Sequence, residues 1–548
     1  MSLPDATAWQ LPWRGLGLSS NLDAGDQPHP YRLLAESPGL FDFVEYSAPL
    51  SFEETRQHAS LFPEMWERRS DVPVLFHPVH LNLYGPELEP VKALEALDAH
   101  ARAVGSAWVG NDIGWWHAGG QPFPGYLYFT PPFTEAGVRD SAAHALHIQA
   151  HLSVPLALEN PAAFAKRGEL HVLDFMARVQ ARTGLPLLLD LGHLLSYQLA
   201  AGLPLEAGLD GFPLDKVIEL HIAGGVVTRR NGRGYYVDDH TQPVREELFA
   251  LLESLLPRCP SLRAVTFEGD GHPPEVAALT LRRLRELVPV APRPPLSLTP
   301  VQEPAPALTR ESEPWRLFET GYGAKPEPGE DAEGARAETD FRLAVVAETL
   351  DKDWPVSRLL LAGTREELRA FTASREFREL FEGLGRSPGH AFAAWARRRV
   401  RERPDEGAMA ALSFEMALPS TFMMRPPPAP GPGQVGLAED VRVGTFPVDL
   451  TELVFAAKAL RRHLTGRAWA CEVLDVSGLE SLAQVARRPA PGPWSFVVRR
   501  KGRGLEVLAP SPSVLKVVRS LAQGPRAVEE VPSPGLAEGL ARGLLRGG

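Results

Sequence analysis

Eight short apolar segments recur along the first half of the chain, and the intervals between them are long enough to hold helices. The segments cover residues 15–18, 41–45, 72–77, 107–112, 154–160, 186–190, 217–221 and 264–268. Apolar runs of this length are typical of strands that are buried on both faces of a parallel sheet. Apolar residues also recur at helical spacing in residues 89–104, 138–151, 243–256 and 275–287. The pattern predicts an α/β fold, a TIM (β/α)8 barrel.

Seven of these eight segments end in a polar residue, which is Glu, His, Asp or Asn. In a (β/α)8 barrel the carboxyl ends of all strands meet at one mouth, so we expect these side chains to converge there. An ordinary polar strand end explains one such residue, but it explains seven poorly. The sequence therefore predicts a functional site at the barrel mouth.

The residues expected at this mouth carry imidazole and carboxylate groups. They are Glu45, His77, Asp112, Glu159, Asp190, His193, His221, Asp238, His240 and Glu268. Both groups bind iron and zinc, and carboxylates can bridge metals and balance their charge. A lone histidine is usually structural, but four that arrive with carboxylates at one barrel face favour a metal centre.

Two local pairs support the metal hypothesis. Asp190 and His193 are three positions apart just past the sixth predicted strand, close enough to reach one centre. Asp238 and His240 lie on one side of an extended segment, because side chains there alternate with period two. No cysteine of the chain lies in a Cys-x-x-Cys pair, which argues against a structural zinc site and favours a reactive one.

The 548 residues exceed one ordinary domain. We assign residues 10–290 to the barrel and residues 291–338, which are proline-rich and then acidic, to a linker. Residues 339–548 are predicted to be helical first and α+β afterwards. This smaller domain includes a capping box at Thr364–Glu367, helices over 450–463 and 513–521, and a hairpin of 494–498 with 505–508 that turns through 501–504.

Composition narrows the function classes. The net charge of −11 disfavours a nucleic-acid binder that relies on phosphate contacts. Two cysteines cannot form a disulfide framework, and they fit a reducing compartment. The chain has no visible secretory signal and no run of 18 apolar residues, so we expect a cytoplasmic protein without a membrane span.

Six segments resemble the motif series of a known family. They are residues 76–81, 158–160, 189–193, 219–224, 238–240 and 267–270, and their order along the chain is respected. The series is similar to that of the DUF692 family, the methanobactin maturase-like, multinuclear non-haem iron-dependent oxidative enzymes. The resemblance implies a TIM barrel with two or three irons, Fe(II) or Fe(III). It carries the ligand role to His77, Glu159, Asp190, His193, His221, Asp238, His240 and Glu268, with Glu159 as the bridging carboxylate.

The chain departs from the family at the fourth strand. The family usually has Ser-Glu-His-Leu there, whereas this chain has Gly110-Asn111-Asp112-Ile113. Asp112 can replace the histidine as an iron ligand, since carboxylate oxygens also suit iron, but the third metal becomes uncertain. We count Asp112 with the metal ligands, and Asp112 and Glu159 as the candidate catalytic residues.

The resemblance also implies a reaction. Family members use O2 as co-substrate in natural-product maturation and modify ribosomally made precursor peptides, typically at cysteine. They usually require a separate partner protein that binds the peptide leader. The C-terminal half loosely resembles such partners through residues 390–396 and the hairpin of Trp494, so this domain is expected to replace a separate partner. A leader peptide could then add to a strand edge of the hairpin. Dimerisation or plain packing is the alternative for this half.

Two other functions stay open at this point. Zinc-dependent hydrolases or isomerases of the endonuclease IV and xylose isomerase type also gather His, Asp and Glu at strand ends. A non-catalytic peptide-binding scaffold would be indicated if metal ligands were missing, and Asp112 is the one hint of that.

Overall fold

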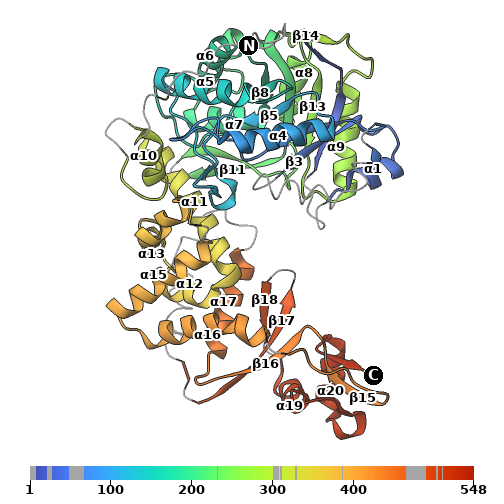
Figure 1. The fold of residues 1–548 in the computed structure, drawn as a ribbon, viewed down its shortest axis with the longest axis vertical. Helices are drawn as coiled ribbons and strands as arrows, with labels where there is room; N and C mark the ends of the chain where they lie inside the picture. The colour runs from blue at the N-terminus through green and yellow to red at the C-terminus, as the bar shows by residue number, and fades with distance from the viewer. Residues whose placement is uncertain are drawn as a thin grey trace. The chain divides into compact units, whose positions relative to one another are not determined.

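The computed structural model divides the chain into two compact units, residues 1–339 and 340–548 (Figure 1). The structure describes residues 8–20, 27–48, 67–68, 70–230, 232–299, 308, 312–326, 330–384, 387–423, 425–464, 489–490, 492–501, 504–508 and 510–548. The boundary falls inside helix α11 (Ala332–Asp353), which belongs to both units. No described helix is long and apolar enough to cross a membrane.

Eight strands of the first unit close into a barrel in which every neighbouring pair is parallel. In barrel order they are β10 (Val217–Ala223), β13 (Ala264–Glu268), β2 (Gly15–Ser20), β3 (Phe43–Ala48), β4 (Val74–Pro78), β5 (Val109–Asp112), β8 (Leu156–Glu159) and β9 (Leu187–Asp190). These strands match the eight predicted ones, and the TIM-barrel prediction is confirmed.

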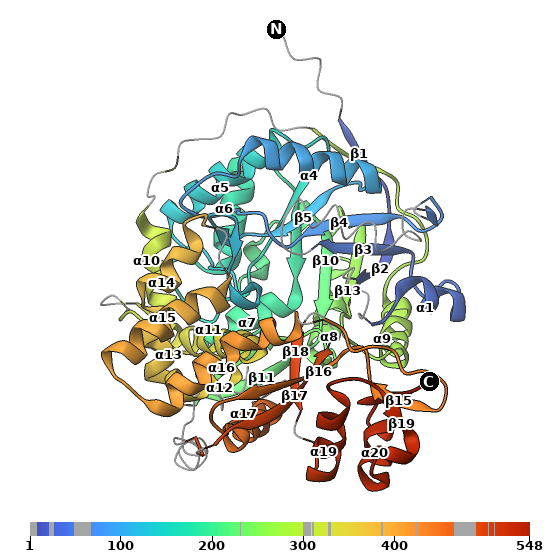
Figure 2. The same cartoon turned by 60° about the horizontal axis from the view of Figure 1, so that its bottom comes forward.

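Helices surround the strands, as the helical spacing predicted (Figure 2). They are α1 (Pro30–Glu36), α4 (Val91–Val104), α5 (Glu135–Gln149), α6 (Val172–Thr183), α7 (Leu191–Ala201), α8 (Glu246–Leu255) and α9 (Pro274–Leu287), with short 3-10 turns η2 (Pro124–Tyr126), η3 (Leu209–Gly211) and η4 (Leu214–Lys216). A continuous apolar core fills the space between strands and helices. The barrel interior holds a separate apolar cluster that includes Phe43, Trp108 and Leu188. Apolar side chains therefore fill the barrel toward the amino ends of its strands.

Three additions decorate the barrel. Strand β1 (Trp9–Leu11) pairs antiparallel with β14 (Leu296–Leu298). The hairpin of β11 (Gly225–Arg230) and β12 (Arg233–Asp238) follows β10, and the short strands β6 (His117–Ala118) and β7 (Gln121–Pro122) follow β5. These two insertions come directly after the carboxyl ends of their strands, so they belong to the mouth.

The range that the sequence assigned to a linker contains ordered elements that its composition did not predict. Helix α10 (Ser312–Gly321), the first turns of α11 and strand β14 all lie between residues 291 and 338. Aromatic residues of α10 pack on the barrel, which explains why a segment flanked by proline-rich sequence is helical here. Residues 300–307, 309–311 and 327–329 of the range lie outside the described part.

The second unit begins with helices and continues as α+β, in agreement with the sequence pattern. Its elements are α12 (Pro355–Leu361), α13 (Arg365–Thr372), α14 (Arg375–Arg378), η5 (Glu379–Phe381), α15 (Pro388–Glu402), α16 (Glu406–Phe422), β15 (Gln434–Leu437), β16 (Val441–Phe446), α17 (Thr451–Leu464), β17 (Trp494–Lys501), β18 (Gly504–Leu508), α19 (Pro512–Leu521), β19 (Arg526–Ala527), η8 (Val528–Glu530), α20 (Ser533–Ala541) and β20 (Leu545–Gly547). The capping box of Thr364 and Glu367 is formed. The predicted hairpin is β17–β18, and residues 502–503 of its turn lie outside the described part.

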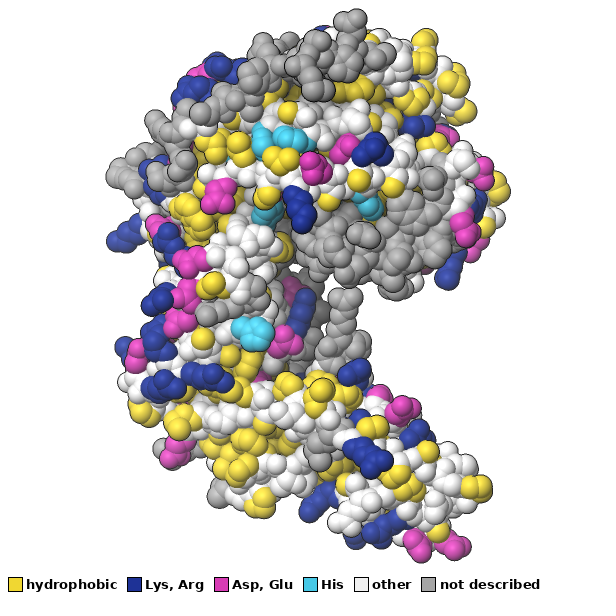
Figure 3. Space-filling model, viewed as in Figure 1, with side chains coloured by type: hydrophobic (Ala, Val, Ile, Leu, Met, Phe, Trp, Pro, Cys, Tyr) yellow, Lys and Arg dark blue, Asp and Glu magenta, His cyan; other side chains and the backbone are white. Residues whose placement is uncertain are grey.

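Two small sheets organise this unit, β16-β17-β18 and β19-β15-β20, and all their described pairs are antiparallel. On the face shown in Figure 3, basic and acidic side chains are interspersed over the described surface of the protein. The described part of this face therefore offers no large patch of a single charge.

Candidate metal centre

The nine predicted metal ligands come together at the carboxyl ends of the barrel strands. Six of them end or nearly end a strand, namely His77, Asp112, Glu159, Asp190, His221 and Glu268. The other three stand just beyond a strand end, in the first turn of α7 (His193) and at or after the end of β12 (Asp238 and His240). Seven of the nine are buried, and Asp238 and His240 are half-buried.

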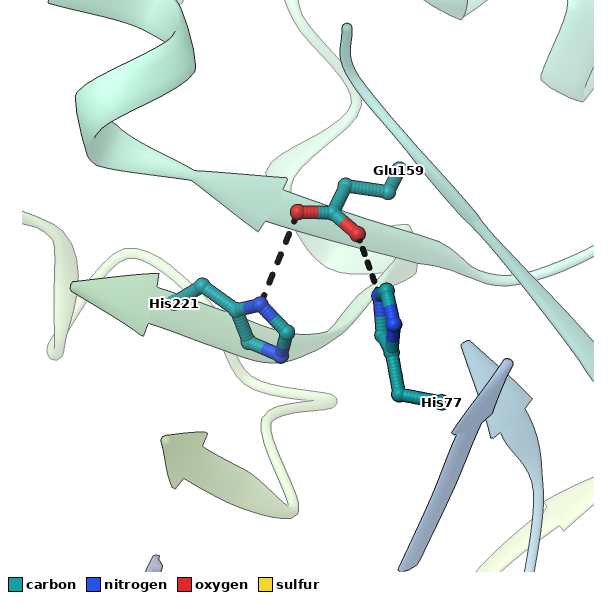
Figure 4. A group of neighbouring side chains, drawn as sticks. All are labelled: His77, Glu159 and His221. Carbon is teal, nitrogen blue, oxygen red and sulfur yellow. Dashed lines mark hydrogen bonds and ion pairs between the residues drawn. The ribbon is translucent and has the colours of Figure 1, made fainter. Parts of the chain in front are cut away.

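Glu159 lies between two imidazoles (Figure 4). Its Oε2 is 2.7 Å from Nε2 of His77, and its Oε1 is 3.5 Å from Nδ1 of His221. The two carboxylate oxygens therefore face different partners, which is the arrangement that a carboxylate shared by two metals requires.

Glu268 repeats this arrangement on another strand of the barrel. Its Oε1 is 3.5 Å from Nδ1 of His221, and its Oε2 is 3.7 Å from Nε2 of His240. His77, Glu159, His221, Glu268 and His240 thus form a continuous string in which imidazoles and carboxylates alternate.

His193 lies near the same oxygen of Glu159 that faces His221, with its Nδ1 3.6 Å from Oε1. Its Nδ1 donates to the carbonyl oxygen of Asn160 at 2.9 Å, because a carbonyl can only accept. The same nitrogen lies 3.2 Å from Oδ1 of Asp112. In the neutral ring, Nε2 then carries the lone pair, and this nitrogen lies 3.4 Å from Oδ2 of Asp238.

Asp238 also reaches His240, whose Nε2 is 3.0 Å from its Oδ2. The structure therefore brings the two side chains of this pair together. On its other side His240 is 3.4 Å from Asp270, which accepts a hydrogen bond from Ser19 at 2.7 Å.

The two carboxylate oxygens of Asp190 have different surroundings. Its Oδ1 caps helix α7 by accepting the backbone N–H of His193 at 2.5 Å. Its Oδ2 is buried and has no hydrogen-bond partner among the described residues, and the strand register sets Asp190 directly beside His221. One oxygen thus serves the fold, and the other is available to a ligand.

The donor set fits metal ions. Two ligands that bind one metal at about 2.1 Å and at right angles lie about 3 Å apart, which is close to most separations within the site. Every predicted ligand except Asp190 belongs to a group of three whose ligand atoms lie within 4.8 Å of one another. Buried polar atoms normally have partners, yet Nδ1 of His77, Nδ1 of His221 and Oδ1 of Asp238 have none among the described residues.

The pKa values of the buried site residues also favour bound cations. Burial, together with the nearby Glu159 carboxylate, raises the pKa of Asp112 to about 7. Burial likewise raises the pKa of Asp190 well above its usual range. Burial alone would lower the pKa of His77, but the Glu159 carboxylate raises it to about 10. The buried carboxylates outnumber the imidazoles, so without metals several of them must hold protons.

Tyr128 is a site residue that the sequence did not indicate. Its hydroxyl donates to Oδ1 of Asp112 at 3.2 Å and accepts the backbone N–H of Ala162 at 2.7 Å. The ring lies over Gly114, where an added Cβ would come within 2.5 Å of it. Because Tyr128 follows Asp112 by sixteen positions through an irregular loop, no local spacing could have revealed it.

Helices α10 and α11 brace the loops that carry the site. Trp315 of α10 packs edge-on against Trp115 of the β5 loop, with ring centroids 5.2 Å apart. Asp331, at the start of α11, accepts two hydrogen bonds at 2.6 Å from Arg233 of β12. Glu338 of α11 forms a 2.6 Å ion pair with Arg167 of the loop after β8. The loops that contain Tyr128, Asn160 and Asp238 are therefore each tied to residues 312–339.

Three further histidines, His80, His117 and His272, come shortly after barrel strands and are not among the predicted ligands. His80 and His272 are buried. His117 is 2.9 Å from the buried carboxylate of Glu89. Trp115 and Trp116 are packing residues, since Trp115 lies among aromatic rings and the ring of Trp116 packs at a tilt against that of Tyr128.

Solved structures with a similar fold include a xylose isomerase domain protein from Planctomyces limnophilus and an endonuclease IV from Thermus thermophilus. The first is 18% identical with a TM-score of 0.32, and it covers 50% of this chain and 95% of that one. The second is 19% identical with a TM-score of 0.32, and it covers 50% and 98%. At these values neither likeness bears on the function.

Two relatives known by their sequences share a higher identity with this chain than these two solved structures do. A UPF0276 protein of Caulobacter vibrioides is 28% identical over 266 residues, which are 48% of this chain and 90% of the relative. A UPF0276 protein of Bordetella parapertussis is 29% identical over 267 residues, with the same coverage. Residues 24–287 also match the model of a family described as RiPP precursor modification enzyme MbnB/TglH/ChrH. The resemblance that the sequence motifs indicated is thereby confirmed, since residues 24–287 are similar to the MbnB/TglH/ChrH family of RiPP precursor modification enzymes.

Proposed function

We propose that this protein is an iron- and O2-dependent enzyme that oxidatively modifies a ribosomally made precursor peptide at a cysteine. The observation that carries the proposal is the position of Glu159, whose two oxygens face His77 and His221 inside a buried, carboxylate-rich mouth. The family of the barrel supports a peptide substrate.

The alternating string of imidazoles and carboxylates supports the following assignment of ligands. Glu159 is proposed as the bridging carboxylate of two irons, which His77, Asp112, Asp190 and His221 would help to hold. Glu268 is proposed to extend the centre toward a third iron, held by His193, Asp238 and His240. When bound, iron supplies redox chemistry with O2 and a position for a soft thiolate ligand.

The protein's own residues prepare the site for this chemistry. The Asn160 carbonyl fixes the ring of His193, and Tyr128 fixes the Asp112 carboxylate. Burial of Glu159 and His221 excludes bulk water, which strengthens electrostatic interactions inside the site. Glu159 and Asp112 are the two residues on which we expect catalysis to depend most.

The reacting thiol is proposed to come from the peptide. Cys259 is buried, and burial raises the pKa of its thiol to about 12. It precedes the start of β13 by five positions, at the end of the barrel opposite the mouth. Cys471 lies outside the described residues.

The C-terminal unit is proposed to recognise the precursor peptide in place of a separate partner protein. The sheet β16-β17-β18 has β16 and β18 as its outer strands within the described part, and an extended peptide can add to such a strand. A covalent tether would raise the effective concentration of bound peptide at the barrel to roughly millimolar if the chain between them permits it.

This second part of the proposal is tested by truncation. The cut belongs after residue 353, at the end of α11, because a cut at 290 would also remove the brace on the metal site. The fragment of residues 1–353 should keep its iron but bind and turn over the precursor poorly. Full activity of this fragment at low concentration would show that residues 354–548 have another purpose, such as dimerisation.

The main proposal is tested on the full chain purified without O2. Metal analysis with electron paramagnetic resonance should find iron, and mass spectrometry of a cysteine-containing precursor should show a mass change only when O2 is admitted. Zinc in place of iron, with O2-independent turnover, would overturn the proposal in favour of a hydrolase or isomerase.

A further inference from the structure

We infer that Glu45 is a positioning residue of the metal centre, whose carboxylate accepts the Nε2 proton of His221 and thereby turns Nδ1 toward the metals. This inference rests on the proposed function, since it concerns a metal bound by His221. It also gives a role to a buried carboxylate of β3 that the ligand set leaves out.

The geometry at His221 determines which ring nitrogen is available. Oε2 of Glu45 lies 3.0 Å from Nε2 of His221, and both side chains are almost completely buried. The ionised carboxylate of Glu45 can only accept, so beside it Nε2 carries the proton and Nδ1 of the neutral ring carries the lone pair. Nδ1 lies 3.5 Å from one oxygen of Glu159 and 3.5 Å from one of Glu268, and it makes no hydrogen bond to a described residue.

The view of the site shows the same division. In Figure 4 one nitrogen of His221 faces Glu159, and the other is turned away from it. The nitrogen on the Glu159 side is thus the one that can bind a metal shared with that carboxylate. Glu45 stands on β3 and reaches His221 on β10 from across the barrel interior.

A second buried carboxylate near the ring, Glu219, is engaged elsewhere. Its Oε2 accepts from Nε1 of Trp108 at 2.6 Å, and its Oε1 accepts from the hydroxyl of Thr266 at 2.9 Å. Its nearest approach to Nε2 of His221 is 3.6 Å, which is longer than a hydrogen bond. Glu45 is therefore the carboxylate that sets the ring, and Glu219 is a matched control.

A carboxylate behind a metal-binding histidine has known consequences. It fixes the tautomer and the orientation of the ring, and it makes the imidazole a stronger donor to the metal. A stronger donor favours the higher oxidation state of the ion, so losing the carboxylate should raise the midpoint potential.

The test uses Glu45→Ala, Glu45→Gln and Glu219→Gln in the full chain, loaded with iron in the absence of O2. Iron affinity is measured by chelator competition, and the midpoint potential by redox titration followed by electron paramagnetic resonance. Glu45→Ala should weaken one iron by about 10–100-fold. Glu45→Gln should keep the iron stoichiometry, because its amide oxygen can still accept from Nε2, and should raise the potential. Glu219→Gln should leave both quantities at the wild-type value.

Each other outcome counts against the inference. If Glu45→Gln and Glu45→Ala keep the wild-type affinity and potential, Glu45 does not position His221. If Glu45→Gln loses a whole iron, Glu45 is itself a ligand, and the positioning role is wrong. If the wild-type chain binds no iron, the proposed function fails instead, so the two failures are distinguishable.

Discussion

Tyr128 donates a hydrogen bond to Oδ1 of Asp112 at 3.2 Å, and its hydroxyl accepts the backbone N–H of Ala162 at 2.7 Å. One phenol thereby links the loop after β5 to the loop after β8 directly above a candidate metal ligand. The link stands at Asp112, the position for which the family resemblance implied a histidine.

Replacing Tyr128 by Phe removes both hydrogen bonds and keeps the ring. We expect the free energy of unfolding to fall by about 1–2 kcal/mol, because a buried carboxylate and a backbone N–H lose partners. We also expect weaker iron binding at Asp112. Chemical denaturation and metal analysis measure the two effects. Tyr235→Phe is the control, since its buried hydroxyl has no hydrogen-bond partner among the described residues, and equal effects of the two variants would refute the role of Tyr128.

The Asp112→His substitution restores the residue type that the family usually has. If Asp112 makes the third site weak, this variant should contain more iron per chain than the wild type when both are loaded under the same conditions. Iron and protein assays on the two samples measure the difference. Three fully occupied irons in the unmodified chain would refute the weak site.

The brace of α11 on the site loops predicts an energetic coupling between Arg233 and Asp331. Their two hydrogen bonds at 2.6 Å are largely shielded from solvent, with side-chain exposures of 20% and 16%. A double-mutant cycle on the free energy of unfolding should give a coupling of roughly 1 kcal/mol or more. The exposed pair Arg283 and Glu246 has the same geometry and should give less. A coupling no larger than that of the exposed pair would show that the brace does not stabilise the site.

The pKa of Asp112, raised by burial to about 7, predicts two opposite pH effects. In the metal-free folded chain Asp112 keeps its proton up to about pH 7, whereas in the unfolded chain it loses this proton near pH 4. The stability from this group is therefore fully present below about pH 4, and it is lost as the pH rises through about 7. Metal must displace the same proton, so the apparent Fe(II) affinity should rise from about pH 5 to pH 8. Anaerobic titrations measure it, and Asp112→Asn should flatten the profile. An affinity that is independent of pH in the wild type would contradict this account.

The barrel and the position of the candidate ligands at its mouth could be predicted because both depend on local patterns. An apolar run such as 186–190 marks a buried strand by itself, and its last residue, Asp190, falls at the mouth because every strand of the barrel points the same way. Neither step needs information about which strands are neighbours.

The remaining features depend on pairs that are far apart in the sequence. Glu45 and His221 are separated by 176 positions, and nothing near either residue reveals which ring nitrogen is protonated. Helix α10 is stabilised by Trp115, which lies far earlier in the chain, so its proline-rich surroundings predicted a linker. Asp190 looked like a ligand only, while the structure also uses it as a helix cap, because a strand end and a helix start coincide there.

The most direct test of the metal centre is the iron content of Glu159→Gln beside Glu89→Gln, both purified as full chains without O2. The two carboxylates are comparable, since each is buried and lies within 3 Å of one histidine, His77 at 2.7 Å and His117 at 2.9 Å. An amide cannot bridge two metals as a carboxylate does, so Glu159→Gln should lose most of its iron. Glu89→Gln should keep the wild-type content of two or three irons per chain. Equal iron content in the two variants would contradict the assignment of Glu159 as the bridging ligand.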